Sequence, residues 1–403
     1  MANFSELQHI AQMGTPTALP KANATALGTA LPTGLVYVND LQPGLTRVSA
    51  ASGFRYRQAS GKWLTDAVAI QRIERLAIPP AYADVWICPL DNGHLQATGR
   101  DARGRKQYRY HTDWHRQRDE TKFVRMAAFG EALPRIRARV ARDLAPAKGL
   151  LLSRNRLLAT LVRLLDTTFV RIGNDEYART NGSFGLTTLR NQHAGVRGNV
   201  LQLRFRGKSG VEYAVRLDDP KVAGVVRRCQ QLPGQELFQY LGEDGQPHTL
   251  SSGDVNEYLA QIGSRPKDRA SGGVRFTAKD FRTWHGSVQA LELTRLACSQ
   301  AQEDSQARYS VKGMLAEVAK MLGNTPAVCR KSYVHPAVMA LNSQLVNDPD
   351  HQQSLWKKLA LSQRPDKLYA AESRLLAFLK VWQRAAKSEP ARPLQRARQA
   401  NLG

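Results

Sequence analysis

The stretch LSRNRLLATLVRLLDTTFV, residues 152–170, indicates the fold class of the chain because its apolar residues recur with a helical period. Steps of three and four residues place the large apolar side chains on one stripe, as in a helix that packs on a core. These side chains are Leu157, Leu161, Leu164, Leu165 and Phe169. The stretch predicts a helical region, and the segments on either side of it complete the fold.

On the N-terminal side, short β-prone runs alternate with turn signals such as DNG and DARG. The runs are LVYVND (35–40), FRYRQ (54–58), DVWICPL (84–90), HLQAT (94–98) and KQYRY (106–110). One amphipathic helix is expected near residues 66–77. We therefore expect a small antiparallel β-rich lobe that contains a single helix.

On the C-terminal side, three alternating runs predict a β-meander with turns at HAGVRGN and GKSG. The runs are GLTTLR (185–190), NVLQLRFR (199–206) and VEYAVRL (211–217). The chain after about residue 219 is expected to be helical throughout. The larger lobe should thus be mainly helical, with a three-stranded sheet.

Local signals place the ends of two helices in this lobe. Thr277 and Asp280 have the spacing of a capping box, which predicts a helix start in TAKDFRTWHG. In LGNTPAVCRKSYVHP (322–336), Gly323 should end one helix, and Thr325 followed by proline should begin the next. Tyr333 would then lie about two turns into that second helix.

These patterns predict an α+β protein of two lobes with flexible ends. We expect residues 1–32, rich in Ala, Thr, Pro and Gly, to be disordered. Residues 33–118 should form the β-rich lobe and residues 119–386 the mainly helical lobe. Residues 387–403 are interpreted as a flexible basic tail.

The charge balance indicates a polyanionic partner. With 58 Lys and Arg residues against 34 Asp and Glu, the 403-residue chain has a formal net charge of +24. Nucleic acid is the commonest partner of such proteins, although ribosomal and membrane-surface proteins share this balance. No apolar run of roughly 18 residues occurs, and Glu6 stands where a signal peptide carries a cation. We therefore expect a cytoplasmic protein without membrane contact.

No metal site is expected from the cysteines or from the acidic residues. The four cysteines lie too far apart for a CxxC pair: Cys88, Cys229, Cys298 and Cys329. This distribution fits a reducing compartment. The acidic pairs in LDDP (217–220) and NDPD (347–350) are of a kind that usually caps helices or faces solvent.

No nucleotide-binding loop is expected either. FRGKSG (205–210) ends like the phosphate loop GxxxxGK[ST], but Gln202 stands where the first glycine would be. The segment also joins two predicted strands, whereas the phosphate loop joins a strand to a helix. The sequence therefore predicts no cofactor.

Fixed cations are the remaining means of phosphate chemistry. Arg171 follows the long helix, and Lys208 lies at the tip of the predicted GKSG hairpin. Lys279 and Arg282 are three residues apart near the start of one helix. Tyr333 stands among further cations, which matters because a phenol with a pKa near ~10 is a poor nucleophile unless positive charge stabilises its oxyanion.

In their order along the chain, these segments resemble the catalytic segments of the type IB DNA topoisomerases, most of all the compact poxviral and bacterial members. The segments are RIGNDEYARTNGSFGLTTLRNQH, FRGKSG, FTAKDFRTWHG and LGNTPAVCRKSYVHP. The resemblance runs from about residue 35 to 385 and implies a catalytic lobe of the kind shared by tyrosine recombinases and topoisomerases. Members of the family cut one strand of duplex DNA by transesterification without metal or ATP, let the helix rotate and reseal it.

The resemblance implies roles for individual residues. Tyr333 is the nucleophile that forms a 3′-phosphotyrosyl bond, and Arg171 and Arg282 hold the non-bridging phosphate oxygens. Lys208 is the general acid that protonates the departing 5′-oxygen, and Lys279 assists it.

One position departs from the most familiar family pattern. Nine residues before the tyrosine many members have histidine, whereas this chain has Asn324. A neutral amide donates a hydrogen bond to phosphate but carries no charge and passes no proton. His285 and His335 are candidates to compensate, with a structural role as the alternative for each.

The segment HLQATGRDARGRKQYRYH resembles the DNA-contacting segment of the family's N-terminal domain. It predicts groove and phosphate contacts by Arg105, Lys106, Gln107, Tyr108 and Tyr110. The alternative is a half-buried strand whose tyrosines pack on the sheet. Tyr177 and Lys331 are further DNA-contact candidates in the larger lobe. The expected assembly is a monomer clamped around double-stranded DNA in the nucleoid.

Two other functions compete with this interpretation. Tyrosine recombinases use the same nucleophile, but they normally carry His-x-x-Arg where this chain has Lys279 and Arg282. A non-enzymatic architectural DNA-binding protein would explain the charge, but it would leave the ordered set of candidate catalytic residues unexplained.

Overall fold

The computed structural model describes residues 34–102, 104–114, 122–145, 152–242, 244–265, 274–303, 310–345, 349–360 and 365–388. The segment 1–32, expected to be disordered, lies outside the described residues, as do all but two residues of the expected tail 387–403. The chain divides into two compact units. The smaller unit is Met1–Arg100 with Lys106–His115, and the larger is Asp101–Arg105 with Arg116–Gly403.

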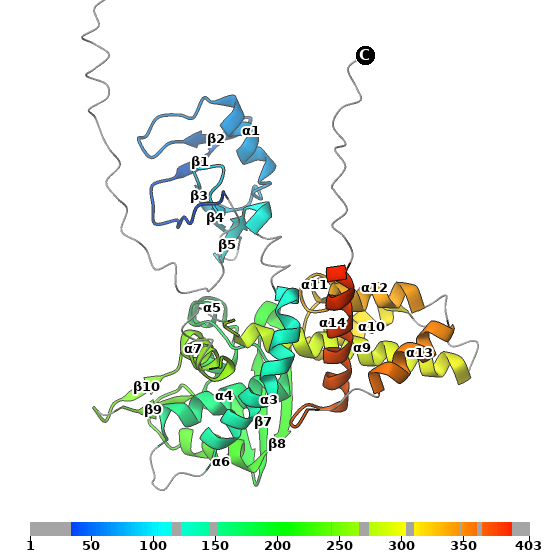
Figure 1. The fold of residues 1–403 in the computed structure, drawn as a ribbon. Coiled ribbons are helices and arrows are strands. Elements are labelled where there is room, and N and C mark those ends of the chain that lie inside the picture. Colours follow the sequence, from blue (N-terminus) through cyan, green and yellow to red (C-terminus); the bar gives the residue numbers. More distant parts are fainter. Residues whose placement is uncertain are drawn as a thin grey trace, which may run out of the picture. The chain divides into compact units, whose positions relative to one another are not determined.

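The smaller unit is an antiparallel sheet on which helix α1, Ala67–Arg75, packs (Figure 1). Its strands lie in the order β2-β1-β3-β4-β5. They are β1 Leu45–Ala50, β2 Gly53–Arg57, β3 Ala83–Ile87, β4 Leu95–Arg100 and β5 Lys106–Tyr110. Helix α1 begins at Asp66, whose side chain accepts from two backbone N–H groups of its first turn. Ile73 of this helix packs with Ile87 and Ala97 of the sheet.

One strand prediction in this unit is wrong. The run LVYVND (35–40) makes only an isolated bridge, between Val36 and Gly93, and the first strand is instead Leu45–Ala50. Val38 is buried in a small cluster with Cys88 and Leu95. The run is therefore apolar because it is partly buried beside the sheet, and it does not pair as one of the sheet's strands.

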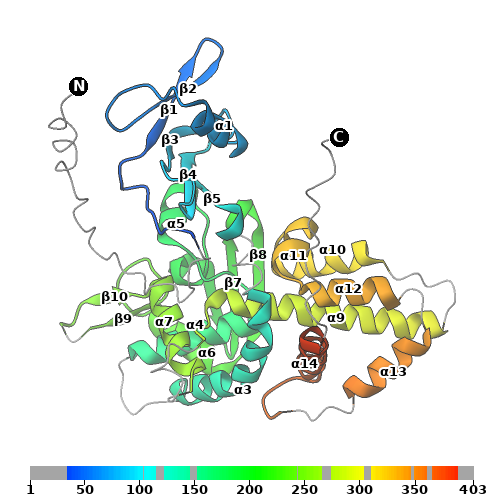
Figure 2. The same ribbon diagram turned by 45° about the horizontal axis from the view of Figure 1, so that its top comes forward.

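The larger unit is mainly helical, and the long helix α9 crosses it (Figure 2). One group of helices packs towards one end of α9: α3 Met126–Asp143, α4 Arg154–Thr168, α5 Asp175–Asn181, α6 Pro220–Cys229 and α7 Ser252–Gly263. The other elements are α9 Ala278–Glu303, α10 Val311–Leu322, α11 Pro326–Ser332, α12 Pro336–Leu345, α13 Pro349–Ala360 and α14 Ala370–Ser388. The predicted leucine stripe of α4 is fully buried in the core of this unit, which confirms the helix.

The expected three-stranded sheet is present, but its first strand lies elsewhere. The strands are β6 Ala194–Arg197, β7 Val200–Arg206 and β8 Glu212–Asp218, in sequential antiparallel order. GLTTLR forms a short 3₁₀ turn instead of a strand, and the expected turn HAGVRGN contains β6. The Thr187 side chain donates to Ile172 O, and Thr188 Oγ1 accepts from Gly185 N. Such side-chain bonds to the backbone favour a turn over a ladder.

The region after residue 219 is not helical throughout. A short hairpin of β9, Gln239–Leu241, and β10, Pro247–Thr249, interrupts it. On the core side of the three-stranded sheet, Leu201, Leu203 and Phe205 are buried, and α4 and α6 contact the sheet. Among the described residues, no helix has the length and apolar character that a membrane span requires.

Candidate active site

Arg171 enters the site because the chain turns sharply after α4. The helix ends just before Phe169, which adopts a left-handed conformation with φ of 59°. Arg171 Nη1 donates to Tyr213 Oη at 2.7 Å, and Nη2 donates to Gly323 O at 3.0 Å. Nη2 also donates to Asn324 Oδ1. Three acceptors from two distant segments therefore hold the guanidinium in one orientation.

Helix α9 positions Arg282, and its predicted start is confirmed. The Asp280 carboxylate accepts from Thr277 N at 2.7 Å and from Thr277 Oγ1 at 2.9 Å. Two residues later, Arg282 is only 3% exposed. It donates through Nη1 to Phe169 O and through Nη2 to Leu322 O at 2.7 Å. Its guanidinium thus joins α9 to the segment before Arg171 and to the end of α10.

Tyr333 lies at the end of α11 and not inside it. Gly323 closes α10 with φ of 58°, and Thr325 caps the start of α11, both as predicted. The helix stops one residue before Tyr333, which is its C-cap residue. Pro336 disfavours a helical conformation at the preceding residue, His335, so the helix ends before His335 and Pro336.

The backbone of Tyr333 is fixed by α9. Ser287 Oγ donates to Tyr333 O at 3.1 Å and accepts from His335 N at 2.9 Å. At Gly286, an added Cβ would lie 3.0 Å from Tyr333 O and 3.3 Å from its Cβ. The helix that carries Arg282 therefore also sets the position of the tyrosine.

Positive charge lowers the pKa of Tyr333. Burial by itself raises this pKa, but Arg282, Arg171 and Lys279 outweigh burial and hold it below the ordinary value. The Arg282 guanidinium carbon lies 5.1 Å from the centre of the tyrosine ring. Burial and the neighbouring Arg171 in turn lower the pKa of Arg282. The site therefore concentrates cations around one phenol.

Two donors in the site have no acceptor among the described residues. They are Asn324 Nδ2 and Arg282 Nε, both buried. The Asn324 amide directs its oxygen to Arg171, so its NH₂ group remains unpaired. A buried donor without a partner costs about 1–3 kcal/mol. Such donors are typical of a site that receives an anionic acceptor.

Lys208 lies at the tip of the hairpin between β7 and β8, as predicted. Gly207 N donates to Val211 O at 2.7 Å, which closes the turn, and Ser209 has φ of 64°. The Lys208 side chain is exposed. Unlike the two arginines, this lysine stands on a projecting turn where it can approach a bound backbone.

Four of the predicted DNA-contact residues lie on strand β5 at one edge of the smaller unit's sheet, and Arg105 lies on the preceding turn, which is assigned to the larger unit. Lys106 Nζ lies 2.7 Å from Asp40 Oδ2, and an Arg105–Asp101 pair lies at 2.6 Å. Tyr108 is 42% exposed, so it is not packed into the core of the sheet. In the larger unit, the candidates on α5 and α11 are likewise exposed: Tyr177 and Lys331.

His285 belongs to a buried ion network. Its Nε2 lies 3.0 Å from Asp166 Oδ1, and Arg137 bonds both Asp166 and Glu372 at 2.7 Å. Asp166, His285 and Glu372 are close enough to hold a metal. The Arg137 guanidinium already pairs with both carboxylates, so this cluster fits an ion-pair network better than a metal site.

His335 is a core residue. Its ring packs edge-on against Phe123 at 5.3 Å and Trp382 at 5.0 Å between ring centres. Burial lowers its pKa to about 4, so the ring is neutral at pH 7. Both histidines that could have compensated for Asn324 thus have structural surroundings.

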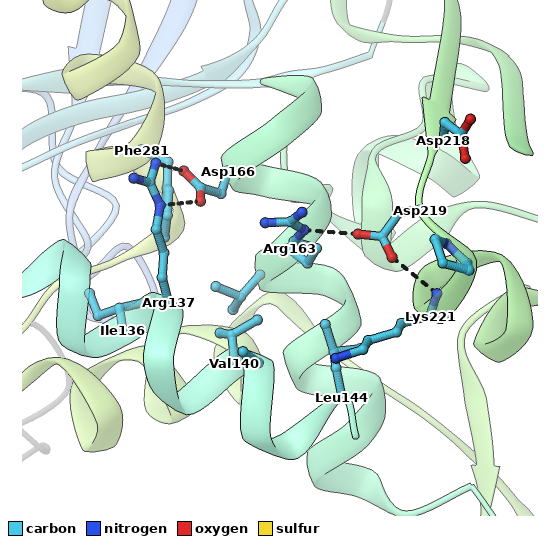
Figure 3. Close-up of a pocket in the computed structure, with 13 residues that line it drawn as sticks. Ile136, Arg137, Val140, Leu144, Arg163, Asp166, Asp218, Asp219, Lys221 and Phe281 are labelled. Atoms are coloured by element: carbon cyan, nitrogen blue, oxygen red, sulfur yellow. Dashed lines mark hydrogen bonds and ion pairs between the residues drawn. The ribbon is translucent and has the colours of Figure 1, made fainter. Parts of the chain in front are cut away.

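A cavity of about 360 Å³ lies elsewhere in the larger unit, between α3, α4 and the start of α6 (Figure 3). Figure 3 shows Arg137 paired with Asp166 and Arg163 paired with Asp219 along its wall. No predicted catalytic residue lines this cavity. The arginines and Tyr333 form a separate site.

Sequence reasoning missed the residues that hold the predicted groups in place. Tyr213, Gly286 and Ser287 have no charge and match no motif that we used. The alternation of β8 does place Tyr213 on the core side of the sheet, five residues after Lys208. Tyr213 contacts Arg171 and Leu322, which lie 42 and 109 residues away in the chain, and no local sequence pattern predicts these contacts.

Comparisons with known proteins identify the family. The profile described as eukaryotic DNA topoisomerase I, catalytic core, matches residues 111–359, and that of the bacterial DNA topoisomerase IB N-terminal domain matches residues 53–101. The DNA topoisomerase 1B of Acanthamoeba polyphaga mimivirus is 30% identical over 304 residues, which cover 73% of this chain and 86% of that protein. The DNA topoisomerase 1B of vaccinia virus (strain Copenhagen) is 23% identical over 291 residues, covering 68% and 82%.

These relatives favour a topoisomerase over a recombinase, in agreement with the order of the motifs. The three-stranded sheet and the cations around Tyr333 lie within residues 111–359, and β2, α1, β3 and β4 of the smaller unit lie within residues 53–101. The chain therefore belongs to the family of type IB DNA topoisomerases.

Proposed function

We propose that this topoisomerase relaxes duplex DNA as a monomer clamped around the helix, with Tyr333 as its nucleophile. The observation that carries the proposal is the group of cations around the half-buried Tyr333: the Arg282 guanidinium lies 5.1 Å from its ring centre, and Arg282, Arg171 and Lys279 together lower its pKa. Burial alone would disfavour the phenolate. The cations make it accessible and also attract the phosphate that it attacks.

In the cleavage step, Tyr333 releases its phenolic proton to solvent, and its Oη bonds to phosphorus while the bond from phosphorus to the 5′-oxygen breaks. Arg171 and Arg282 contact the non-bridging oxygens, where negative charge builds up in the transition state. Lys208 gives a proton to the leaving oxygen, and Lys279 assists it. Religation is the reverse of these steps and restores the phenol and the intact strand.

The unpaired donors have a natural acceptor in this scheme. Asn324 Nδ2 and Arg282 Nε, both buried without partners among the described residues, would each donate to a phosphate oxygen. Asn324 would then replace the histidine of other members as a neutral donor. Because the arginines and lysines supply the positive charge, the reaction requires no metal. Because transesterification keeps the phosphodiester energy in the phosphotyrosyl bond, religation requires no ATP.

The substrate contacts extend along the DNA backbone. Arg105 and Lys106 would contact phosphates, and Gln107 would read base edges in the major groove. Tyr108, Tyr110, Tyr177 and Lys331 complete the contact set. A net charge of +24 favours a long duplex as partner. Such a protein would act on the cytoplasmic nucleoid.

Relaxation of a supercoiled plasmid in EDTA tests the proposal. The wild type should relax supercoils of both signs and form a denaturation-resistant adduct with DNA. Tyr333→Phe should do neither, yet bind duplex DNA nearly as well, because only one hydroxyl is lost. Tyr240→Phe, a loss of the same group on β9, is the matched control and should remain active. An adduct formed by Tyr333→Phe, or a wild type inactive in EDTA, would refute the mechanism.

A further inference from the structure

Tyr213 lies where three catalytic segments meet, although nothing in the sequence marks it. It is half-buried on β8, on the core side of the three-stranded sheet. Its ring stacks on Phe205 of β7, with ring centres 5.1 Å apart and planes within 3°. This register pair fixes the ring on a rigid part of the sheet.

The hydroxyl of Tyr213 connects the two arginines. Oη accepts from Arg171 Nη1 at 2.7 Å and donates to Leu322 O at 3.4 Å. Leu322 O also accepts from Arg282 Nη2 at 2.7 Å. A hydroxyl both donates and accepts, so one group serves both bonds.

The same ring packs against the turn that carries Lys208. At Gly207 an added Cβ would lie 2.5 Å from Tyr213 Cε2, so the ring rests directly on this backbone. At Gly323 an added Cβ would lie 2.3 Å from Tyr213 Oη. Gly323 precedes Asn324, and its φ of +58° suits glycine. The tyrosine therefore touches the Lys208 hairpin and the turn before Asn324.

We infer that Tyr213 is a positioning residue that orients Arg171 on the scissile phosphate and fixes the Asn324 turn relative to the Lys208 hairpin. The inference rests on the proposed function of these groups. With Tyr213, Gly323 and Asn324 as acceptors, one hydrogen of Nη1 and the Nε–H of Arg171 remain for phosphate. Loss of the hydroxyl frees Nη1, and the guanidinium no longer has a single orientation.

The test is single-turnover cleavage of a nicked suicide duplex by Tyr213→Phe, which keeps the ring and its stack. Cleavage should slow about tenfold, the size of one hydrogen bond to a charged group. Religation should slow by the same factor, because both directions cross one transition state. Tyr258→Phe is the matched control, since it also loses a buried hydroxyl, bonded at 2.7 Å to Asp143. It should lower thermal stability and leave cleavage unchanged.

Two further measurements separate positioning from packing. The double variant Tyr213→Phe with Arg171→Ala should cleave no more slowly than Arg171→Ala alone. If Tyr213→Phe instead caused a general packing defect, its rate loss would add to that of Arg171→Ala. The second measurement uses a duplex with sulfur in place of the leaving 5′-oxygen. A thiol, with a pKa near ~8.5, leaves without protonation, so sulfur should rescue Lys208→Ala but neither Arg171→Ala nor Tyr213→Phe.

The outcomes distinguish the inference from the proposed function. An unchanged rate for Tyr213→Phe, an additive double variant or rescue by sulfur would each overturn the positioning of Arg171 by Tyr213. Wild-type cleavage by Arg171→Ala, or failure of sulfur to rescue Lys208→Ala, would refute the assigned catalytic roles themselves.

Discussion

The cations around Tyr333 and those on β5 are arranged in opposite ways. At the tyrosine, Arg171 and Arg282 have no carboxylate partner among the described residues, and they depend on carbonyl, amide and phenol oxygens for their position. At β5 and the turn before it, which are proposed to contact DNA, Arg105 lies against the carboxylate of Asp101 and Lys106 against that of Asp40. A neutral acceptor orients a cation and leaves its charge for the substrate, whereas a carboxylate cancels it.

This contrast matches the proposed roles of the two regions, which are catalysis at Tyr333 and DNA contact at β5. Stabilising a transition state requires charge that is already in place and not compensated. Tracking a duplex requires contacts that form and release, and a carboxylate that competes with phosphate weakens each of them.

Arg282→Gln should reduce cleavage by a factor of ~10² or more, the usual loss when a transition-state donor is removed. The change removes a cation that lies 5.1 Å from the centre of the Tyr333 ring. It also alters the hydrogen bonds that Arg282 donates to Phe169 O and Leu322 O. Single-turnover cleavage measures the loss. Arg163→Gln is the control, because Arg163 is paired with Asp219 on the wall of the cavity. Equal losses in the two variants would contradict a special role for the uncompensated arginine.

Asn324→Ala should slow cleavage and religation together by about tenfold, less than Arg171→Ala, because a neutral donor stabilises charge less than a guanidinium does. Asn324→His should retain activity if the imidazole reaches the same oxygen. Thr325→Ser, which keeps the helix cap beside it, is the control. Cleavage at the wild-type rate by Asn324→Ala would mean that the side chain neither contacts the phosphate nor is needed to orient Arg171.

The sequence predicted the helix ends beside the candidate catalytic residues better than it predicted the contacts that hold these residues in place, for a physical reason. Helix ends depend on neighbouring residues, so Thr277 with Asp280 and Gly323 with Thr325 were read correctly. The residue types and their order also identified the family. The contacts of Tyr213, by contrast, join β8 to α10 and to the turn after α4, and no window of sequence contains these partners together.

The two strand predictions that were wrong have a similar explanation, since contacts outside each segment contribute to its structure. GLTTLR alternates like a strand, but its threonines bond to local backbone and to Ile172. LVYVND is apolar because Val38 is buried, although no strand pairs with it. Helix α11 ends before Tyr333, three residues ahead of Pro336. A proline disfavours a helical conformation at the residue before it, so this helix end does have a local signal in the sequence.

Lys279→Ala should shift the pH profile of cleavage to higher pH. Lys279 is one of the cations that lower the pKa of Tyr333, so its removal raises that pKa and demands a higher pH for the same phenolate fraction. The shift should be less than about one pH unit and shrink with added salt, because Lys279 is exposed. Lys312→Ala, an exposed lysine on α10, is the control. A shift to lower pH would contradict the sign of the electrostatic effect.

Asp40→Asn should have the smallest effect and the opposite sign, a gain in affinity for duplex DNA. Asp40 Oδ2 lies 2.7 Å from Lys106 Nζ and accepts from Thr98 Oγ1 at 2.9 Å. Burial raises the pKa of Asp40, but Lys106 and Thr98 more than offset it, so the carboxylate is charged at pH 7. Its removal takes a carboxylate competitor away from Lys106, so a phosphate can take that place, and the slope of log K against log salt should steepen by about one. Asp66→Asn is the matched control, since it removes one charge from the same unit and asparagine caps α1 equally well. If both variants gain equally, net charge alone sets affinity, and the pairing on β5 does not tune DNA binding.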